Sequence, residues 1–337
     1  MTAWILHTYL LRFSANRYIN RYIIWKRGFY VASLVFGPVP SRRLGRSLGV
    51  DLVPFKTCSY DCIYCQLGRT TCKTVERKQW MPMHRLLEDL EKKLDTRPDY
   101  ITLSGSGEPT LFKPLDKLID GIRAMTDVPI AVLTNGSLLH LKEVQRELLK
   151  VDLAVPSLDA GSEKTFRLVN RPHESISFEQ MLAGLIEFRR IFDGPYWLEV
   201  FIIGAYTTFE QELAEIRRCV ERIQPDRVQL NTVTRPPAES YAATVPREQL
   251  EEIAATFSPP AEVIADFRTV AGDEVGRAGR EEILQLLQRR PCSIDDIVGG
   301  LTLHRNEVLK HVEHLCADGF LEESRVGGKL YYKAAGQ

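Results

Sequence analysis

Short apolar runs alternate with longer amphipathic stretches through the middle of the chain. Runs of aliphatic and β-branched residues bounded by turn residues are typical of buried strands. They occupy Tyr100–Leu103, Ile130–Leu133, Leu153–Val155, Leu198–Ile203 and Val228–Leu230. Apolar residues at helical spacing fill the intervals Met83–Leu94, Leu115–Met125, Leu141–Lys150, Phe178–Phe192 and Phe209–Ile223. With the earlier run Leu48–Val53, the pattern predicts six βα units, a parallel sheet and ligand chemistry at the carboxyl ends of its strands.

The pattern changes towards the C-terminus. Residues 258–276 predict a linker, because Ser258-Pro259-Pro260 and Ala271-Gly272-Asp273 interrupt any periodicity. Beyond it the sequence predicts helices at Glu281–Gln288, Ile294–Val298 and His304–Ala317, then strands at Phe320–Ser324 and Lys329–Lys333 around a Gly-Gly turn. Three helices followed by a hairpin resemble a winged helix-turn-helix. We therefore divide the chain into an extension (1–33), an α/β domain (34–257), the linker (258–276) and a winged-helix domain (277–337).

Charge limits what these domains could bind. Lys and Arg balance Asp and Glu, 44 against 44, so no global field draws the 337-residue chain to nucleic acid or to a membrane. Residues 277–337 carry nine basic and nine acidic side chains, unlike a typical DNA-binding domain. The C-terminal domain could instead hold a protein, peptide or RNA substrate, or pack on the α/β domain as a lid.

The first thirty residues differ from the rest, with five Lys or Arg, eight aromatic residues and no acidic residue. Such a segment could bind a membrane surface or nucleic acid. It does not match a signal peptide and is too short and too charged to span a bilayer. We favour a simpler interpretation, in which translation begins near Val31 and the preceding residues are a start-site artefact.

Seven cysteines are present, and three of them fall within eight residues, Cys58, Cys62 and Cys65. Such clustering in a chain of this length is not a secreted disulfide framework, and it predicts a reducing cytoplasm. Thiolates suit zinc or iron–sulfur centres. A structural zinc site needs a fourth ligand, for which Cys72 or His84 is available. A four-iron cluster held by three cysteines instead keeps one iron open for chemistry.

The spacing of the cysteines, with Tyr64 just before the last, resembles the radical SAM superfamily. The resemblance implies a partial (βα)6 barrel in which Cys58, Cys62 and Cys65 hold a [4Fe-4S] cluster and Tyr64 lies against the adenine of S-adenosylmethionine. In that superfamily one electron from the cluster cleaves the cofactor to a 5′-deoxyadenosyl radical. The stretch from Phe36 to Cys65 also resembles the iron–sulfur oxidoreductase branch related to the wyosine-base synthase of tRNA.

Further cofactor contacts follow from that resemblance at the ends of the predicted strands. In Ser104-Gly105-Ser106-Gly107-Glu108-Pro109, Gly107 and Glu108 would hold the methionyl amino group, although Ser106 stands where the family more often has glycine. The ribose and carboxylate would be contacted by Asn135, Ser157 and Asp159, with Arg171 as a carboxylate clamp and the backbone at Gly204 against adenine. Helix caps and surface side chains are the ordinary alternatives at these positions. The segment after the sixth strand, 231–237, could close over the site.

Three arginines, beside glycines and prolines, predict a loop ahead of the run Leu48–Val53. Arg42, Arg43 and Arg46 could hold an anion there, or simply lie on a solvated surface. Lys26 and Lys56 are the only lysines before the cysteine loop.

The substrate is not set by these residues. No cysteine precedes Cys58 to hold a second cluster, which argues against wyosine formation itself. RNA and peptide substrates both remain open, as does a metal-sensing winged-helix transcription regulator. The enzyme reading requires a flavodoxin- or ferredoxin-like electron donor.

Overall fold

The computed structural model describes residues 33–41, 43–265, 279–301, 303, 305–326 and 328–335. The N-terminal extension, except Ser33, lies outside the described residues, as do Arg42 and the end of the predicted linker, 266–276. No helix in these described ranges is long and apolar enough to cross a membrane.

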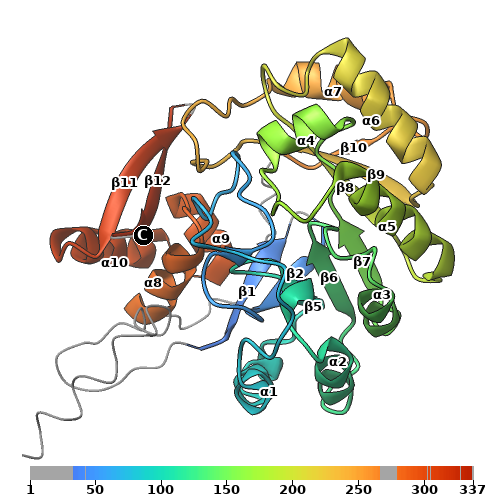
Figure 1. The fold of residues 1–337 in the computed structure, drawn as a ribbon. Coiled ribbons are helices and arrows are strands. Elements are labelled where there is room, and N and C mark those ends of the chain that lie inside the picture. The colour runs from blue at the N-terminus through green and yellow to red at the C-terminus, as the bar shows by residue number, and fades with distance from the viewer. Residues whose placement is uncertain are drawn as a thin grey trace, which may run out of the picture. The chain divides into compact units, whose positions relative to one another are not determined.

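Six parallel strands form the centre of the α/β domain, in the order of the chain (Figure 1). The strands are β2 (Gly45–Val50), β5 (Tyr100–Leu103), β6 (Ile130–Thr134), β7 (Leu153–Pro156), β8 (Trp197–Ile202) and β9 (Arg227–Thr232). Single parallel bridges, Ala154 with Tyr196 and Ser157 with Glu199, continue the pairing from β7 to β8. The prediction of an α/β fold with a parallel sheet is therefore confirmed.

Helices follow the strands and cover the outer face of the sheet (Figure 1). They are α1 (Met83–Glu91), α2 (Leu115–Arg123), α3 (Lys142–Leu148), α4 (Glu163–Val169), α5 (Phe178–Ile191), α6 (Glu210–Ile223) and α7 (Arg247–Ala255). Alternation along each strand explains the two faces: Ile130 and Val132 pack into the main core, whereas Ala131 joins a separate cluster on the inner face. Local signals fix the helix starts, since Ser162 caps α4 and Ser177 forms a capping box with Gln180 at α5.

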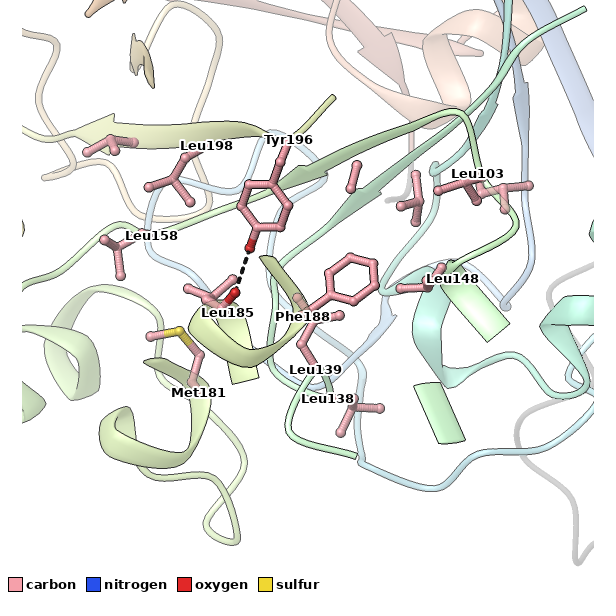
Figure 2. Packing of buried hydrophobic residues seen from close by; sticks show 14 of the residues in the cluster. Leu103, Leu138, Leu139, Leu148, Leu158, Met181, Leu185, Phe188, Tyr196 and Leu198 are labelled. Atoms are coloured by element: carbon pink, nitrogen blue, oxygen red, sulfur yellow. Dashed lines mark hydrogen bonds between the residues drawn. The ribbon is translucent and has the colours of Figure 1, made fainter. Parts of the chain in front are cut away.

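The main core is densely apolar around α5. Figure 2 shows Phe188 and Leu185 of this helix beside Tyr196 and Leu198, with the Tyr196 hydroxyl donating to the carbonyl of Leu185 at 3.2 Å. Tyr196 is fully buried, so this bond satisfies a hydroxyl that would otherwise be costly to bury.

Several elements differ from the prediction: helices α4 and α7 were not expected, and β2 begins and ends three residues before the predicted run Leu48–Val53. The stretch before that run, read as a loop, contains β1 (Val35–Ser41), which pairs antiparallel with β2 and carries a register shift between Phe36 and Val39. The sequence did not predict β1, because Pro38 and Pro40 lack the backbone N–H groups that strands usually donate. An edge strand tolerates such prolines. The start of the predicted linker 258–276 holds β10 (Glu262–Val263), which adds to β9 and packs against the main core.

The C-terminal residues form the elements that the sequence predicted. Helices α8 (Arg280–Arg289), α9 (Ile294–Leu301) and α10 (Arg305–Ala317) precede the antiparallel hairpin of β11 (Leu321–Val326) and β12 (Lys329–Ala334). Their apolar side chains share one core with Val39 and Phe36 of β1. These C-terminal helices and strands are therefore packed on the edge of the sheet.

Candidate functional site

The three clustered cysteines lie in a loop whose base is tied to the end of β5. Two short parallel strands, β3 (Thr57–Cys58) and β4 (Cys72–Lys73), close the loop. Its first residues run beside the Ser-Gly-Glu motif: the Lys56 amide donates to the Ser106 carbonyl at 2.7 Å, and Thr57 pairs with Gly107. The loop thus stands at the carboxyl ends of the strands, where parallel α/β folds bind ligands.

The segment that follows α4 holds the opposite side of the cysteine loop. The amide of Asp61 donates to the Asn170 carbonyl at 3.0 Å and the amide of Ile63 to the Val169 carbonyl at 2.9 Å. The amide of His173 donates to the Ser59 carbonyl at 2.8 Å. Backbone bonds on two sides therefore fix where the cysteines stand.

The three thiols are free and half-buried. Burial, with a contribution from nearby Glu108, raises the pKa of Cys58 to about 12. Burial first, and then Asp159 and the two neighbouring cysteines, raise the pKa of Cys62. The thiols are thus close enough to affect one another, and their thiolate forms need a positively charged partner. Among the described residues, no group of three or more Cys, His, Asp or Glu side chains is arranged to hold a single metal ion. This includes any group that would use Cys72 or His84 as the fourth ligand.

Each sulfur accepts a hydrogen bond from a different side-chain nitrogen. Asn135 Nδ2 lies 3.5 Å from Cys58 Sγ, and Asn170 Nδ2 lies 3.5 Å from Cys62 Sγ. Lys56 Nζ lies 3.6 Å from Cys65 Sγ. A neutral thiol is a weak acceptor, so these donors suit sulfurs that carry negative charge, as in an iron–sulfur cluster. The residues present fit such a cluster.

Tyr64, Asp159 and Asn170 form a buried network beside the cysteines. The carboxylate of Asp159 accepts from the Tyr64 hydroxyl, from Asn170 Nδ2 at 2.6 Å and from the Phe201 amide at 3.3 Å. Burial raises the pKa of Asp159 to about 6, although the bonds from Tyr64 and Asn170 lower it. The ring of Tyr64 stacks on Phe201, with centroids 3.9 Å apart. Two of the predicted cofactor residues are thus brought together.

Glu108 is buried, and its carboxylate accepts hydrogen bonds from groups of the protein itself. Its carboxylate accepts from the Thr110 amide and hydroxyl, from the Thr134 hydroxyl at 2.6 Å and from the Asn135 amide at 2.8 Å. Burial raises the pKa of Glu108, while these hydrogen bonds lower it. The side chain therefore joins the end of β5 to the end of β6 and places Asn135 beside Cys58. Its predicted contact with a methionyl amino group stays a prediction.

The other predicted residues are distributed around this centre. Ser157 follows β7 and its amide donates to the Thr134 carbonyl at 3.0 Å. Gly204, after β8, pairs with Ala243. Arg171 contacts carboxylates of this chain, with Nη1 2.6 Å from Glu239 and 3.9 Å from Asp61. Its predicted role as a clamp for the cofactor carboxylate therefore stays untested.

Both described arginines of the predicted anion loop contact oxygen atoms of the chain itself, and their proposed binding of an anion stays a prediction. Arg43 pairs with Glu199 of β8, and the Arg46 guanidinium donates to the Thr96 carbonyl at 2.8 Å.

Three residues near the cysteines were not expected. Asn170 reaches Cys62, Lys56 reaches Cys65, and Glu239 holds Arg171 while its amide donates to the Ile63 carbonyl at 2.9 Å. None of the three carried a usable signal in the sequence, because each is brought to the cysteine loop by a turn or loop that tertiary packing positions.

Comparisons with known proteins identify the family. The pattern of the radical SAM superfamily matches residues 52–220. A UPF0026 protein of Methanocaldococcus jannaschii is 32% identical over 311 residues, covering 89% of this chain and 95% of that protein. A protein of Brachyspira hyodysenteriae named GTPase Obg is 40% identical over 303 residues, which are 88% of this chain but only 45% of that protein.

Two solved structures share the fold. Streptococcus suis SuiB, bound to its precursor peptide SuiA, superimposes with a TM-score of 0.50 at 13% identity, over 63% of this chain and 47% of SuiB. A radical SAM methyltransferase from Sphaerobacter thermophilus gives a TM-score of 0.50 at 15% identity, over 64% of this chain and 65% of the enzyme. With the superfamily pattern across half its length and a UPF0026 relative aligned almost end to end, the chain belongs to the radical SAM superfamily.

Proposed function

We propose that this protein is a radical SAM enzyme that holds one [4Fe-4S] cluster on Cys58, Cys62 and Cys65 and abstracts hydrogen from a substrate carbon. The observation that supports it is the cysteine loop, which stands at the carboxyl ends of a parallel sheet with a nitrogen donor aimed at each sulfur. When bound, the cluster supplies one electron, taken from a flavodoxin- or ferredoxin-like donor, for reductive cleavage of S-adenosylmethionine.

The protein's own residues would orient the cofactor and keep water out. Tyr64, Asp159 and Asn170 form one side of the site, and Asn135 with Ser157 forms the neighbouring side at the ends of β6 and β7. Segment 231–237 contacts the cysteine loop, since Arg235 Nη1 donates to Gln66 at 3.1 Å. This contact supports the expectation that segment 231–237 closes over the site.

We further propose that residues 279–335 form a winged helix that serves as a fixed wall of the substrate site. Three helices and a hairpin occur in the required order, and the Tyr331 hydroxyl of the hairpin donates to the Thr234 carbonyl, after β9, at 2.7 Å. RNA and peptide substrates both suit such a wall. The relation to the wyosine-synthase branch rests on the sequence resemblance alone.

The cluster assignment is tested by anaerobic reconstitution with iron and sulfide. We expect wild type to bind iron and sulfide in equal amounts with broad visible absorption, and Cys58→Ala, Cys62→Ala and Cys65→Ala to lose both. Cys72→Ala is the matched control, because Cys72 lies in the same loop and is not one of the proposed ligands. Full iron and sulfide content in Cys62→Ala, or zinc binding that requires Cys72, would contradict the cluster assignment.

A further inference from the structure

Lys56 is a buried lysine that faces a cysteine sulfur. Its side chain is 3% exposed, and Nζ lies 3.6 Å from Cys65 Sγ and also donates to the Gly68 carbonyl. Among the described residues, no carboxylate lies within ion-pair distance of this ammonium. A buried charge without a counter-charge is costly, so the position requires negative charge from another source.

The backbone holds Lys56 in place at some cost. Its φ is +64°, a left-handed conformation that costs a residue with a side chain about 1 kcal/mol. The conformation is kept by hydrogen bonds on both sides: its amide donates to Ser106 O, and its carbonyl accepts from the amides of Thr71 and Cys72, both at 3.1 Å. Such retained strain is a feature of functional sites. It directs the side chain back across the loop to the sulfur of Cys65.

The missing counter-charge matches the cluster of the proposed function. Three thiolates give a [4Fe-4S] cluster a net negative charge, and reduction adds one more negative charge. A fixed positive charge nearby stabilises the reduced state more than the oxidised state, and hydrogen bonds to cluster sulfur act in the same direction. Asn135 and Asn170 provide uncharged donors to the other two sulfurs, so Lys56 is the charged member of the three.

We propose that Lys56 is a positioning residue that raises the reduction potential of the cluster through its ammonium at Cys65. This inference rests on the proposed function. It predicts that the site accepts an electron from a weaker reductant than it would without Lys56. No bond is made or broken in this step, because one electron passes from the external donor to the cluster.

The test is a redox titration of the reconstituted holoprotein with dithionite, without substrate, followed by visible absorption. In Lys56→Met the ratio of reduced to oxidised cluster at a fixed potential should fall at least tenfold, equivalent to about 59 mV for one electron. Lys56→Arg keeps the positive charge, so its reduction potential should stay close to that of wild type. The control Lys73→Met should leave the potential unchanged, since Lys73 lies in the same loop but contacts the carbonyls of Arg171 and Pro172.

Each outcome decides the question. A Lys56→Met cluster with the wild-type potential overturns the role of Lys56 and leaves the proposed function intact. If wild type itself binds no cluster, both proposals fail. A further outcome is that Lys56→Met folds, as judged by thermal melting, but binds no cluster. Lys56→Arg then decides the question. Cluster binding by Lys56→Arg supports the need for positive charge at this position, whereas its absence shows that the site needs the shape of lysine and overturns the inference.

Discussion

Asp159 shows how one residue can connect the chemistry of the site to the stability of the fold. It is 5% exposed, and its carboxylate accepts hydrogen bonds from Tyr64, Asn170 and the Phe201 amide. Burial nevertheless raises its pKa to about 6. A carboxyl with a raised folded-state pKa binds its proton more tightly when folded, so its contribution to stability is present at low pH and is lost as pH rises through about 6.

Replacing Asp159 by asparagine should remove this pH dependence. We expect the free energy of unfolding of apo Asp159→Asn, relative to wild type, to increase by up to about 3 kcal/mol between about pH 4 and pH 7, since about two pKa units separate the folded and unfolded states. Urea unfolding across that range measures it. The exposed Asp120 provides a control in Asp120→Asn. A difference that stays constant with pH would show that Asp159 is not held at a raised pKa.

Spacing in the sequence identified the single residues that adjoin strand ends. Asn135 and Asp159 could be predicted, because the carboxyl ends of parallel strands meet along one edge. Lys56 and Asn170 could not, since each reaches its sulfur through a turn: Lys56 through a left-handed backbone, Asn170 at the end of a short helix, α4, that the apolar pattern did not show. The carboxylate of Glu108 was expected in the site, and Thr110, two residues further on, bonds it within the same turn. Thr134 and Asn135 reach it only through tertiary packing.

Among the elements, the junction between β5 and the cysteine loop leaves no room for a side chain at Gly107. A Cβ there would lie 1.7 Å from the carbonyl oxygen of Thr57 and 2.9 Å from Val53 Cγ2. The close approach lets Thr57 pair with Gly107, immediately before Cys58. The glycine therefore sets the distance between the strand and the cysteines.

Gly107→Ala should push the loop from the strand. We expect the apoprotein to lose about 2 kcal/mol or more of unfolding free energy, and the reconstituted protein to lose most of its iron, because backbone atoms cannot move aside as a flexible side chain does. Gly319→Ala is the control: its φ is +74° with nothing within 4 Å of the added carbon, so it should cost only about 1 kcal/mol and keep its iron. Equal iron content in the two variants would contradict the role given to Gly107.

Most strands with clear apolar runs were predicted within a residue or two, β5 among them, whereas β2 was expected three residues later in the chain than it occurs. Two of the missed strands share a physical cause. The edge strand β1 contains prolines, and the two-residue strand β10 is too short to show a pattern. Both pack on a neighbouring strand whose position is set by the fold, so local sequence could not reveal them.

Across the whole folded unit, a buried ion pair joins the C-terminal domain to the strand beside the site. Arg289 of α8 pairs with Asp51, which directly follows β2, and the side chains are 13% and 8% exposed. The other oxygen of Asp51 accepts from the amide and hydroxyl of Ser106, at 2.9 and 2.8 Å. The guanidinium also lies over the ring of Phe36, 4.2 Å from its centroid. The C-terminal domain thus contacts the loop that carries Gly107 and Glu108 through a single carboxylate.

Arg289→Ala should destabilise the protein by about 3–5 kcal/mol, because it leaves the buried carboxylate of Asp51 without its partner. Arg280→Ala, in the same helix, removes an exposed pair with Asp318 and should cost less than about 1 kcal/mol. Urea unfolding compares the two. Similar losses in both variants would show that the contact between the C-terminal domain and Asp51 carries little energy.

Reductive cleavage of S-adenosylmethionine at the cysteine loop can be measured directly in one anaerobic assay. Reconstituted wild type is mixed with dithionite and S-adenosylmethionine, and 5′-deoxyadenosine is quantified alongside Cys62→Ala and Cys72→Ala. We expect 5′-deoxyadenosine from wild type and Cys72→Ala and none from Cys62→Ala. If wild type carries its full complement of iron and sulfide but forms no 5′-deoxyadenosine, the proposed function is wrong.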